Sequence, residues 1–331
     1  MTLSRFNGIS ISGIVNVLPH QRVYNDTSEL IESQQRTQLI EVTGINERRR
    51  AKLTCIEHYF SYGMDKLLTH LQWDTKSIDI LLCVTQTAFP SMPAVSCVLQ
   101  AKHNLSSDTQ CFDINLGCSG YVYGLQTAMA LLQSVAGSNA RAILCCGDLS
   151  SLLLDPNDKS TQPVFSDGVS VTALSLSGQN TPAFFNTSTY GDGKNAIYTE
   201  LNGNKEVMRL NGIDVFSYSV RYVPAHVKAL LQFAHTDTQN TDAFIFHQAN
   251  KLINGAICNQ LQISPDKAPE TLSLYGNTAS ASIPITLGKY LSTPHHKPVK
   301  VLLCGFGVGF SIASCLLTVD SDLFVSTEEW E

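Results

Sequence analysis

Short, fully apolar runs alternate along the chain with longer segments in which apolar residues recur every three or four positions. The short runs are typical of strands buried on both faces of a sheet, and the longer segments are typical of helices. We expect strands at residues 78–84, 111–115, 142–146, 169–176, 243–246, 299–304 and 310–319. We expect helices at residues 57–71, 121–135, 215–233 and 279–291. This alternation predicts a layered α/β protein.

The second half of the chain repeats the order of landmarks found in the first half. Each landmark is the start of an apolar strand or a glycine turn, and the three offsets between counterparts agree within five residues. The pairs are Asp79–Leu82 with Asp242–Ile245, Gly117–Ser119 with Gly276–Thr278, and Gly147 with Gly305. A nearly constant offset is typical of an internal duplication. We therefore predict two related halves, residues 1–178 and 179–331, with the junction in residues 178–182.

The composition fits a large buried core, because 44% of the 331 residues are hydrophobic and only 15% are charged. The net charge of −6 argues against a nucleic-acid-binding protein, which would carry a basic surplus. The basic cluster Arg48-Arg49-Arg50 fits either a solvated turn or a docking patch. Three long uncharged stretches, residues 80–101, 114–140 and 301–319, contain prolines, glycines or amides, so we expect no membrane span.

The cysteines indicate a reducing compartment. Ten are present, none with CxxC spacing, so the sequence gives no support for a zinc site and we expect no bound metal. Many lie in apolar runs, as expected of buried, reduced thiols, namely Cys83, Cys97, Cys145, Cys146, Cys258, Cys304 and Cys315. The first twelve residues lack the apolar stretch of a signal peptide, and we expect a cytoplasmic protein.

Cys118 has a different setting, in Asn115-Leu116-Gly117-Cys118-Ser119-Gly120 between a predicted strand and a predicted helix. Its small neighbours permit a tight turn and a close approach by a substrate. A thiol at a helix N-terminus lies near free N–H groups and the positive end of the dipole, which favours the nucleophilic thiolate. By itself, Cys118 fits either a nucleophile or a structural cysteine at a crowded turn.

Two further polar residues follow predicted buried elements of the second half. His247 comes directly after the strand at residues 243–246, and Asn277 occupies the position that corresponds to Cys118 in the duplication. If the halves are related by a pseudo-twofold axis, all three side chains face one cavity, with a nucleophile beside two potential oxyanion donors. The glycine-rich run Gly305–Phe310 lacks the spacing of a dinucleotide-binding loop and predicts a bend between two strands.

These residues and their order resemble the β-ketoacyl-acyl-carrier-protein synthase III family of the thiolase superfamily over nearly the whole chain. The Cys–His–Asn set is that of the synthase III branch, whereas elongating synthases use Cys–His–His and thiolases use a second cysteine. The shared motifs are Thr43–Arg48, Phe89–Ser91, Gly117–Gly120, Asp155–Asp158, Phe165–Gly168, Asn211–Gly212 with Val215–Phe216, His247–Asn250, Gly276–Thr278 and Gly305–Phe310.

The resemblance implies a five-layer αβαβα sandwich and a homodimeric acyltransferase. Cys118 would take an acyl group as a thioester, and His247 and Asn277 would stabilise the enolate formed when a malonyl thioester loses CO₂. The backbone N–H groups of Cys118 and Val308 would form a second oxyanion hole. Phe89 would close the acyl pocket of the partner subunit. No cofactor would be bound permanently, and the substrates would be acyl-CoA or acyl carrier protein together with malonyl carrier protein.

Other positions are assigned by the resemblance to the substrate tunnel or to carrier docking: Asn211, Gly212, Phe216, Ala249, Asn250 and Lys251. The chain also departs from close relatives. Gln38 and Val42 stand where a tryptophan and an arginine hold the CoA adenine, and Leu252 replaces a docking arginine, for which Lys251 is a substitute. Ser166 replaces a common glycine. These departures favour a carrier-bound acyl donor and a specialised lipid, polyketide or glycan pathway.

Three other functions fit parts of the sequence. Acyl transfer to a hydroxyl or amine would use the same nucleophile without forming a carbon–carbon bond. A cysteine hydrolase would use a similar spacing of Cys118, His247 and Asn277, although the local signature of papain-like enzymes is absent. A non-catalytic partner subunit of a synthase heterodimer would not need the complete Cys–His–Asn set.

Overall fold

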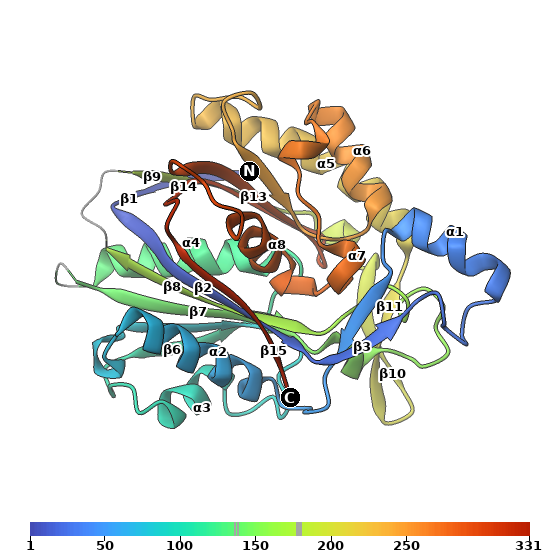
Figure 1. Ribbon diagram of the computed structural model, residues 1–331, viewed down its shortest axis with the longest axis horizontal. Coiled ribbons are helices and arrows are strands. Elements are labelled where there is room, and N and C mark those ends of the chain that lie inside the picture. The colour runs from blue at the N-terminus through green and yellow to red at the C-terminus, as the bar shows by residue number, and fades with distance from the viewer. Residues whose placement is uncertain (136, 138, 177–180) are drawn as a thin grey trace.

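Two mixed β-sheets form the centre of the protein, as Figure 1 shows for the computed structural model, which describes residues 1–331 except 136, 138 and 177–180. The first sheet has the order β15 (Phe324–Trp330), β2 (Ile9–Pro19), β8 (Gly168–Leu176), β7 (Arg141–Asp148), β5 (Ile80–Val84) and β6 (Gln110–Ile114). The second has the order β1 (Thr2–Asn7), β9 (Pro182–Thr189), β14 (Ser311–Val319), β13 (Val299–Gly307) and β12 (Ala243–Phe246). Two antiparallel strand pairs stand apart, β3 (Gln21–Tyr24) with β4 (Glu47–Arg50) and the hairpin of β10 (Ile197–Asn202) with β11 (Lys205–Leu210).

Helices lie between the sheets and on both outer faces. The middle layer consists of α4 (Gly120–Ser134), which contacts β5, β7, β13 and β14, and α8 (Ser282–Leu291), which contacts β2, β12 and β13. Outside the first sheet lie α2 (Ile56–Leu71) and α3 (Val95–Lys102), and outside the second lie α5 (Gly212–Phe233) and α6 (Lys251–Leu261). Two shorter elements lie nearer these strand pairs, α1 (Ser33–Thr43) against α6 and α7 (Leu272–Tyr275) against β4. The predicted αβαβα sandwich is confirmed.

The middle layer explains why the α4 segment is apolar on nearly every side. Tyr121, Val122 and Leu125 are fully buried in one cluster that includes Leu82 of the first sheet and Leu303 of the second. A helix packed between two sheets has no face left for water, so it shows weak amphipathicity. The side chains of α4 therefore separate the two sheets near Cys118, which lies just before this helix.

The first and last strands of the chain each belong to the sheet formed mainly by the opposite half. The N-terminal strand β1 pairs with β9 of the second sheet, and the C-terminal strand β15 pairs in parallel with β2 of the first. Each half thus contributes one strand to the sheet of the other half. The division into residues 1–178 and 179–331 stays a prediction, since residues 178–180 of its predicted junction, 178–182, lie outside the described residues.

Two predicted helices begin elsewhere in the structure. The segment predicted as one helix at 279–291 splits into a 3₁₀ turn, Ala279–Ala281, and α8, which starts at Ser282. Ala279 has a φ of +45°, which interrupts the α-helical path. The helix predicted from residue 215 starts at Gly212, because the Asn211 side chain accepts a hydrogen bond from the Asp214 N–H at 3.2 Å and caps it.

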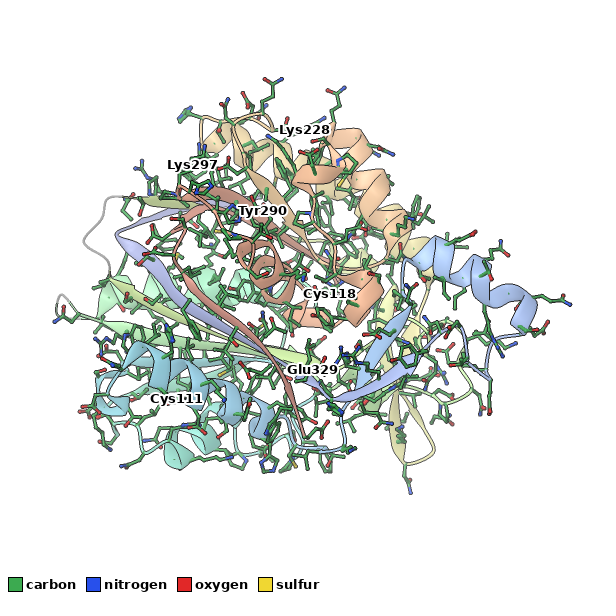
Figure 2. All side chains as sticks on the ribbon, in the orientation of Figure 1. Cys111, Cys118, Lys228, Tyr290, Lys297 and Glu329 are labelled. Carbon is green, nitrogen blue, oxygen red and sulfur yellow. The ribbon has the colours of Figure 1, made fainter. Side chains whose placement is uncertain are left out.

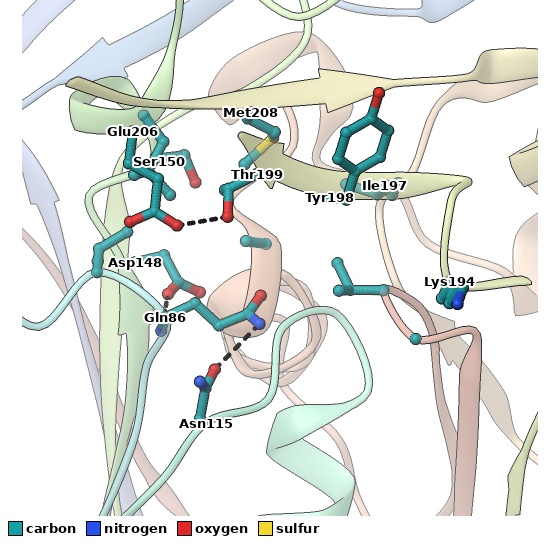
Figure 3. A pocket seen from close by; sticks show the side chains of 15 residues that line it. Gln86, Asn115, Asp148, Ser150, Lys194, Ile197, Tyr198, Thr199, Glu206 and Met208 are labelled. Atoms are coloured by element: carbon teal, nitrogen blue, oxygen red, sulfur yellow. Dashed lines mark hydrogen bonds between the residues drawn. The ribbon is translucent and has the colours of Figure 1, made fainter. Parts of the chain in front are cut away.

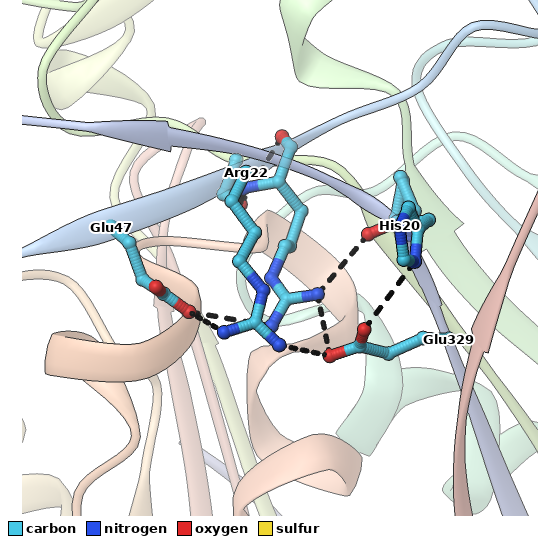
Figure 4. Close-up of polar contacts among 7 residues, drawn as sticks. His20, Arg22, Glu47 and Glu329 are labelled. Carbon is cyan, nitrogen blue, oxygen red and sulfur yellow. Dashed lines mark hydrogen bonds and ion pairs between the residues drawn. The ribbon is translucent and has the colours of Figure 1, made fainter.

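The basic cluster is neither a solvated turn nor a docking patch, because Arg48 and Arg49 are buried in β4. The Arg49 guanidinium lies 3.3 Å from Glu47 and 2.9 Å from Glu329, and Arg22 lies 2.7 Å from Glu329 (Figure 4). Glu329 belongs to β15, so these ion pairs hold the C-terminal strand against the paired strands β3 and β4.

Two of the seven cysteines expected to be buried differ from the prediction. Among those predicted to be buried, Cys97 is exposed and Cys258 half-buried, and the other five are buried. Cys97 lies on α3, which covers an outer face and therefore keeps one side toward water. Within the described ranges, no helix is both long and apolar enough to cross a membrane.

Candidate active site

Cys118 lies in the short connection between β6 and α4 and is only 3% exposed (Figure 2). Strand β13 passes directly beside it. A β-carbon built on Gly305 would lie 2.5 Å from the Cys118 carbonyl oxygen, and one built on Gly307 would lie 2.8 Å from Sγ. Gly307 also has a φ of +154°, a conformation that other residues rarely adopt. The predicted bend in this glycine-rich run is therefore found, and its glycines allow the strand to approach the sulfur.

The electrostatics of the thiol differ from the sequence prediction. Burial raises the pKa of Cys118 to about 12, and the nearby Asp148 carboxylate also raises it. Backbone hydrogen bonds from Cys118 itself and from Val308 lower the pKa but only in part. The expected lowering by the helix N-terminus was thus wrong for the free protein. Desolvation of the anion in a closed interior outweighs the favourable N–H groups.

Asp148, which is not among the predicted site residues, ends β7 beside the site and is buried. Its carboxylate accepts hydrogen bonds from the Ser280 hydroxyl at 2.5 Å and from the Gln86 N–H at 2.7 Å. Burial raises the pKa of Asp148 to about 6, against the lowering effect of these hydrogen bonds. The sequence signal for Asp148 was its position just after the apolar strand predicted at residues 142–146. Asp148 ties the loop after β5 to the segment that follows Asn277.

His247 follows β12 and is 2% exposed. Its backbone N–H donates to the Cys304 carbonyl at 2.8 Å, which continues the pairing of β12 with β13. Its Nδ1 lies 2.7 Å from the hydroxyl of Ser282, the first residue of α8. Burial lowers the pKa of His247 to about 3, although a hydrogen bond with the Ala279 backbone raises it. The imidazole is therefore neutral at physiological pH, and Ser282 engages one ring nitrogen. The sequence carried no signal for Ser282.

Asn277 follows α7 through Gly276, whose φ is +63°. The Asn277 side-chain oxygen accepts a hydrogen bond from the Ala279 N–H at 2.9 Å. This bond fixes the orientation of the carboxamide, so that Nδ2 serves as the donor. The backbone of Asn277 also pairs with Phe165 in an isolated parallel bridge. These contacts join the two halves at this point.

The three predicted side chains line one small cavity of about 60 Å³, together with Phe306 and Gly307. Among the predicted tunnel residues, Gly212, Ala249 and Asn250 line the same cavity. The structure thus brings the nucleophile, the imidazole and the carboxamide together, as the duplication predicts.

The remaining predicted residues lie elsewhere. Asn211 caps α5, and Phe216 packs against the buried cluster between α5 and the second sheet. Lys251 is exposed at the start of α6, and Phe89 is 68% exposed. Neither the Cys118 cavity nor the larger cavity beside it includes any of these four residues.

A second cavity of about 340 Å³ adjoins the first (Figure 3). The two share Ile197 as a lining residue, and the larger one reaches Val308 and Asp148 next to the sulfur. Its other polar lining comes from the segments after β5, β6 and β7, from Lys194 and from the β10–β11 hairpin.

One possible set of metal ligands occurs among the described residues, Cys55, Glu57 and His58 at the start of α2. None of the three lines either cavity.

Comparison with known proteins agrees with this geometry. The model of the 3-oxoacyl-[acyl-carrier-protein] synthase III family matches residues 112–193, which contain Cys118, and the model of its C-terminal region matches residues 231–319, which contain His247 and Asn277. A crystal structure of a 3-oxoacyl-(acyl-carrier protein) synthase from Burkholderia xenovorans LB400 is 32% identical, covers 99% of both chains and has a TM-score of 0.94.

Curated relatives extend over the same length. A Campylobacter jejuni protein whose name assigns it provisionally to 3-oxoacyl-[acyl-carrier-protein] synthase 3 is 31% identical over 95% of both chains. A β-ketoacyl-[acyl-carrier-protein] synthase III from Prochlorococcus marinus is 27% identical and covers 94% of this chain and 96% of its own. These matches do not favour a cysteine hydrolase or a non-catalytic subunit. The chain belongs to the 3-oxoacyl-[acyl-carrier-protein] synthase III family, a family of acyltransferases with the thiolase-type fold.

Proposed function

We propose that this protein condenses an acyl group, carried as a thioester on Cys118, with a malonyl thioester that loses CO₂. The observation that carries the proposal is the cavity shared by Cys118, His247 and Asn277. It places one nucleophile beside two side chains that can donate hydrogen bonds without carrying charge. Such donors stabilise negative charge that develops on an oxygen.

In the first half-reaction, the Cys118 sulfur attacks the carbonyl carbon of the acyl donor. The donor's thiolate leaves and takes up the proton that Cys118 loses, so a new thioester replaces the old one. The backbone N–H groups of Cys118 and Val308 already face the sulfur. We propose that they also hold the carbonyl oxygen when it becomes an oxyanion.

In the second half-reaction, a malonyl thioester enters and its carboxylate leaves as CO₂. The electron pair of the broken bond passes into the thioester as an enolate, whose oxygen accepts hydrogen bonds from His247 and from Asn277 Nδ2. Neutral His247 suits this role when the Ser282 hydroxyl donates to Nδ1, because Nε2 then carries the proton and can donate it. The carbanion then attacks the acyl carbon, and Cys118 leaves as a thiolate that regains a proton. No step requires a resident metal or organic cofactor.

For its partners, we propose an acyl carrier protein that reaches the cavity along α6. Lys251 is exposed at the start of this helix, one residue after Asn250 of the cavity wall. The ammonium group of Lys251 would attract an acidic carrier surface. The exposed Val42 on α1 offers no charge to a CoA nucleotide, which supports a carrier-bound donor over acyl-CoA.

We further propose a cytoplasmic homodimer. Two large apolar side chains, Phe89 and Met92, are 68% and 81% exposed in one loop of the single chain. Such a concentration of exposed apolar surface is typical of an interface. In the dimer, Phe89 would reach the acyl pocket of the partner subunit.

Intact-protein mass spectrometry with an acyl donor tests the division of labour. Cys118→Ser should abolish the acyl mass shift, and label that persists on this variant would remove Cys118 from its role. His247→Ala and Asn277→Ala should keep acyl loading but reduce malonyl decarboxylation roughly 100- to 1,000-fold, the effect of losing one oxyanion donor. If His247→Ala or Asn277→Ala lost acyl loading but kept malonyl decarboxylation, the roles assigned to these two residues would be contradicted. Cys97→Ser, at an exposed cysteine, is the matched control and should load normally.

A further inference from the structure

The two backbone N–H groups that face the Cys118 sulfur come from distant parts of the chain. One belongs to Cys118, between β6 and α4, and the other to Val308, in the turn between β13 and β14. Val308 lies between Gly307 and Gly309, whose φ values are +154° and +129°. Glycine permits many backbone conformations, so these two neighbours do little to fix the direction of the Val308 N–H. Another contact is needed to hold it.

Ser311, the first residue of β14, supplies such a contact. Its hydroxyl donates a hydrogen bond to the Val308 carbonyl at 2.9 Å. Its backbone pairs with Gly307 at the last register position of β13 and β14. Ser311 thus holds the chain on both sides of the Val308 N–H, at the preceding residue and at the carbonyl of Val308 itself. Ser311 is only 4% exposed, so little water reaches its hydroxyl.

The Ser311 hydroxyl also contacts Ser119, the residue that follows the nucleophile. The two Oγ atoms lie 2.7 Å apart, and Ser119 is 1% exposed. Each hydroxyl has one proton to donate. Because Ser311 donates its proton to the Val308 carbonyl, Ser119 is the donor between the two hydroxyls. The hydrogen bonds therefore run in one direction, from Ser119 through Ser311 to Val308.

Ser119 forms this contact in place of a helix cap. It is the N-cap residue of α4, a position where serine usually accepts a hydrogen bond from the first turn of its helix. In the described part of the chain, its side chain forms no capping hydrogen bond. A serine cap typically contributes about 1 kcal/mol to stability. The hydroxyl of Ser119 instead joins the segment that carries Cys118 to the turn that carries Val308.

We infer that Ser119 and Ser311 are positioning residues, which orient the Val308 N–H relative to the Cys118 N–H so that both donate to one oxygen. This inference rests on the proposed function, because that oxygen is the carbonyl oxygen of the acyl thioester in the first half-reaction. Donors that are held in place before the reaction need no reorganisation when negative charge develops. The hydroxyl groups of the two serines supply this rigidity where the glycines beside Val308 do not.

The test compares two rates in each variant. Acyl loading on Cys118 is followed by intact-protein mass spectrometry, with the fastest donor among the pantetheine thioesters of acetate, butyrate and octanoate. Decarboxylation is followed as CO₂ release from malonyl-pantetheine. Ser311→Ala should slow loading about tenfold, a factor equal to about 1.4 kcal/mol. This loss is smaller than the roughly 100- to 1,000-fold loss on removing an oxyanion donor, because the Val308 N–H is misdirected and not removed. Decarboxylation, assigned to His247 and Asn277, should stay nearly unchanged.

Two further variants test whether Ser119 acts through Ser311. Ser119→Ala removes only the outer hydrogen bond and should slow loading roughly threefold. The double variant Ser119→Ala/Ser311→Ala should load about as slowly as Ser311→Ala alone. Independent effects would multiply to about thirtyfold and would overturn the chain of hydrogen bonds. Ser175→Ala is the matched control, because it breaks another serine pair, with Ser12 at 2.8 Å, between β8 and β2; it should keep both rates.

The outcomes separate this inference from the proposed function. A Ser311→Ala protein that loads as fast as the unchanged protein would overturn the inference while upholding Cys118 as nucleophile. Equal loss of loading and decarboxylation, in a variant whose Tm is unchanged, would also overturn it. If no donor labels Cys118 in the unchanged protein, the proposed function fails, and the inference fails with it. Thermal melting of each variant verifies that it folds.

Discussion

The replacement of Gly307 by alanine is the sharpest structural perturbation of the nucleophile. A β-carbon at this position would lie 2.8 Å from both Cβ and Sγ of Cys118. Ordinary contacts between such atoms are about 3.5–4.0 Å, so the sulfur or the strand must shift by roughly 1 Å. A misplacement of about 1 Å costs a reaction on the order of 100-fold in rate. We predict that Gly307→Ala lowers the rate of acyl loading by about this factor.

The assay is the initial rate of acyl-enzyme formation, read by intact-protein mass spectrometry alongside the Tm. Gly255→Ala is the matched control, because a β-carbon at Gly255 would have no neighbour within 4 Å. Gly255 lies inside α6, where alanine should stabilise the protein by roughly 0.5–1 kcal/mol and leave loading unchanged. Normal loading by a folded Gly307→Ala protein would refute the idea that β13 positions the sulfur by close approach.

Three further predictions concern titration and the supporting contacts. Since the pKa of Cys118 is about 12, the rate of its alkylation by iodoacetamide, measured on the Cys118 peptide, should rise about tenfold per pH unit from pH 6 to 9. A rate that reaches a plateau near neutral pH would contradict this. Ser282→Ala removes the partner of His247 Nδ1 and should lower malonyl decarboxylation about tenfold with normal acyl loading, whereas equal loss of both would point to general damage. Burial raises the pKa of Glu329, but the ion pairs with Arg49 and Arg22 outweigh burial and lower this pKa below its usual 4.5. The ion pairs therefore stabilise the folded protein above pH 4.5, and this stabilisation disappears as the carboxylate is protonated at lower pH. Glu329→Gln should therefore lower the Tm at pH 7, with a difference that shrinks as the pH falls below 4.5; a difference that is independent of pH would show that the charge is not responsible.

The sequence predicted the layered architecture, and it predicted that Cys118, His247 and Asn277 would share one cavity. The strand at Ala243–Phe246 and the buried α4 helix follow from local hydrophobic patterns that tertiary packing reinforces. The correspondence between Cys118 and Asn277 follows from order along the chain, and both line one cavity.

The sequence could not predict features that depend on distant contacts. The exchange of β1 and β15 between sheets depends on strand pairing, which periodicity does not encode. The direction of the Cys118 pKa shift was wrong, because the local helix terminus was visible in the sequence and the depth of burial was not. Ser282 contacts His247 through a hydrogen bond between residues 35 positions apart, and no sequence motif indicates this contact.

The hydrogen bond between the Gln86 and Asn115 side chains lies between these two cases. Gln86 follows the strand predicted at 78–84 and Asn115 ends the strand predicted at 111–115, but the prediction did not include the fact that β5 and β6 are adjacent and parallel. Once that pairing is known, their juxtaposition follows, because neighbouring parallel strands end at the same edge of a sheet.

The fate of a labelled malonyl thioester tests condensation most directly. With an acyl donor and malonyl thioester labelled with ¹³C in the free carboxyl group, the protein should release one labelled CO₂ for each β-ketoacyl product, which is two carbons longer than the donor acyl group. An acyl group that reaches a hydroxyl or amine acceptor with its carbon count unchanged, without release of labelled CO₂, would contradict condensation at Cys118.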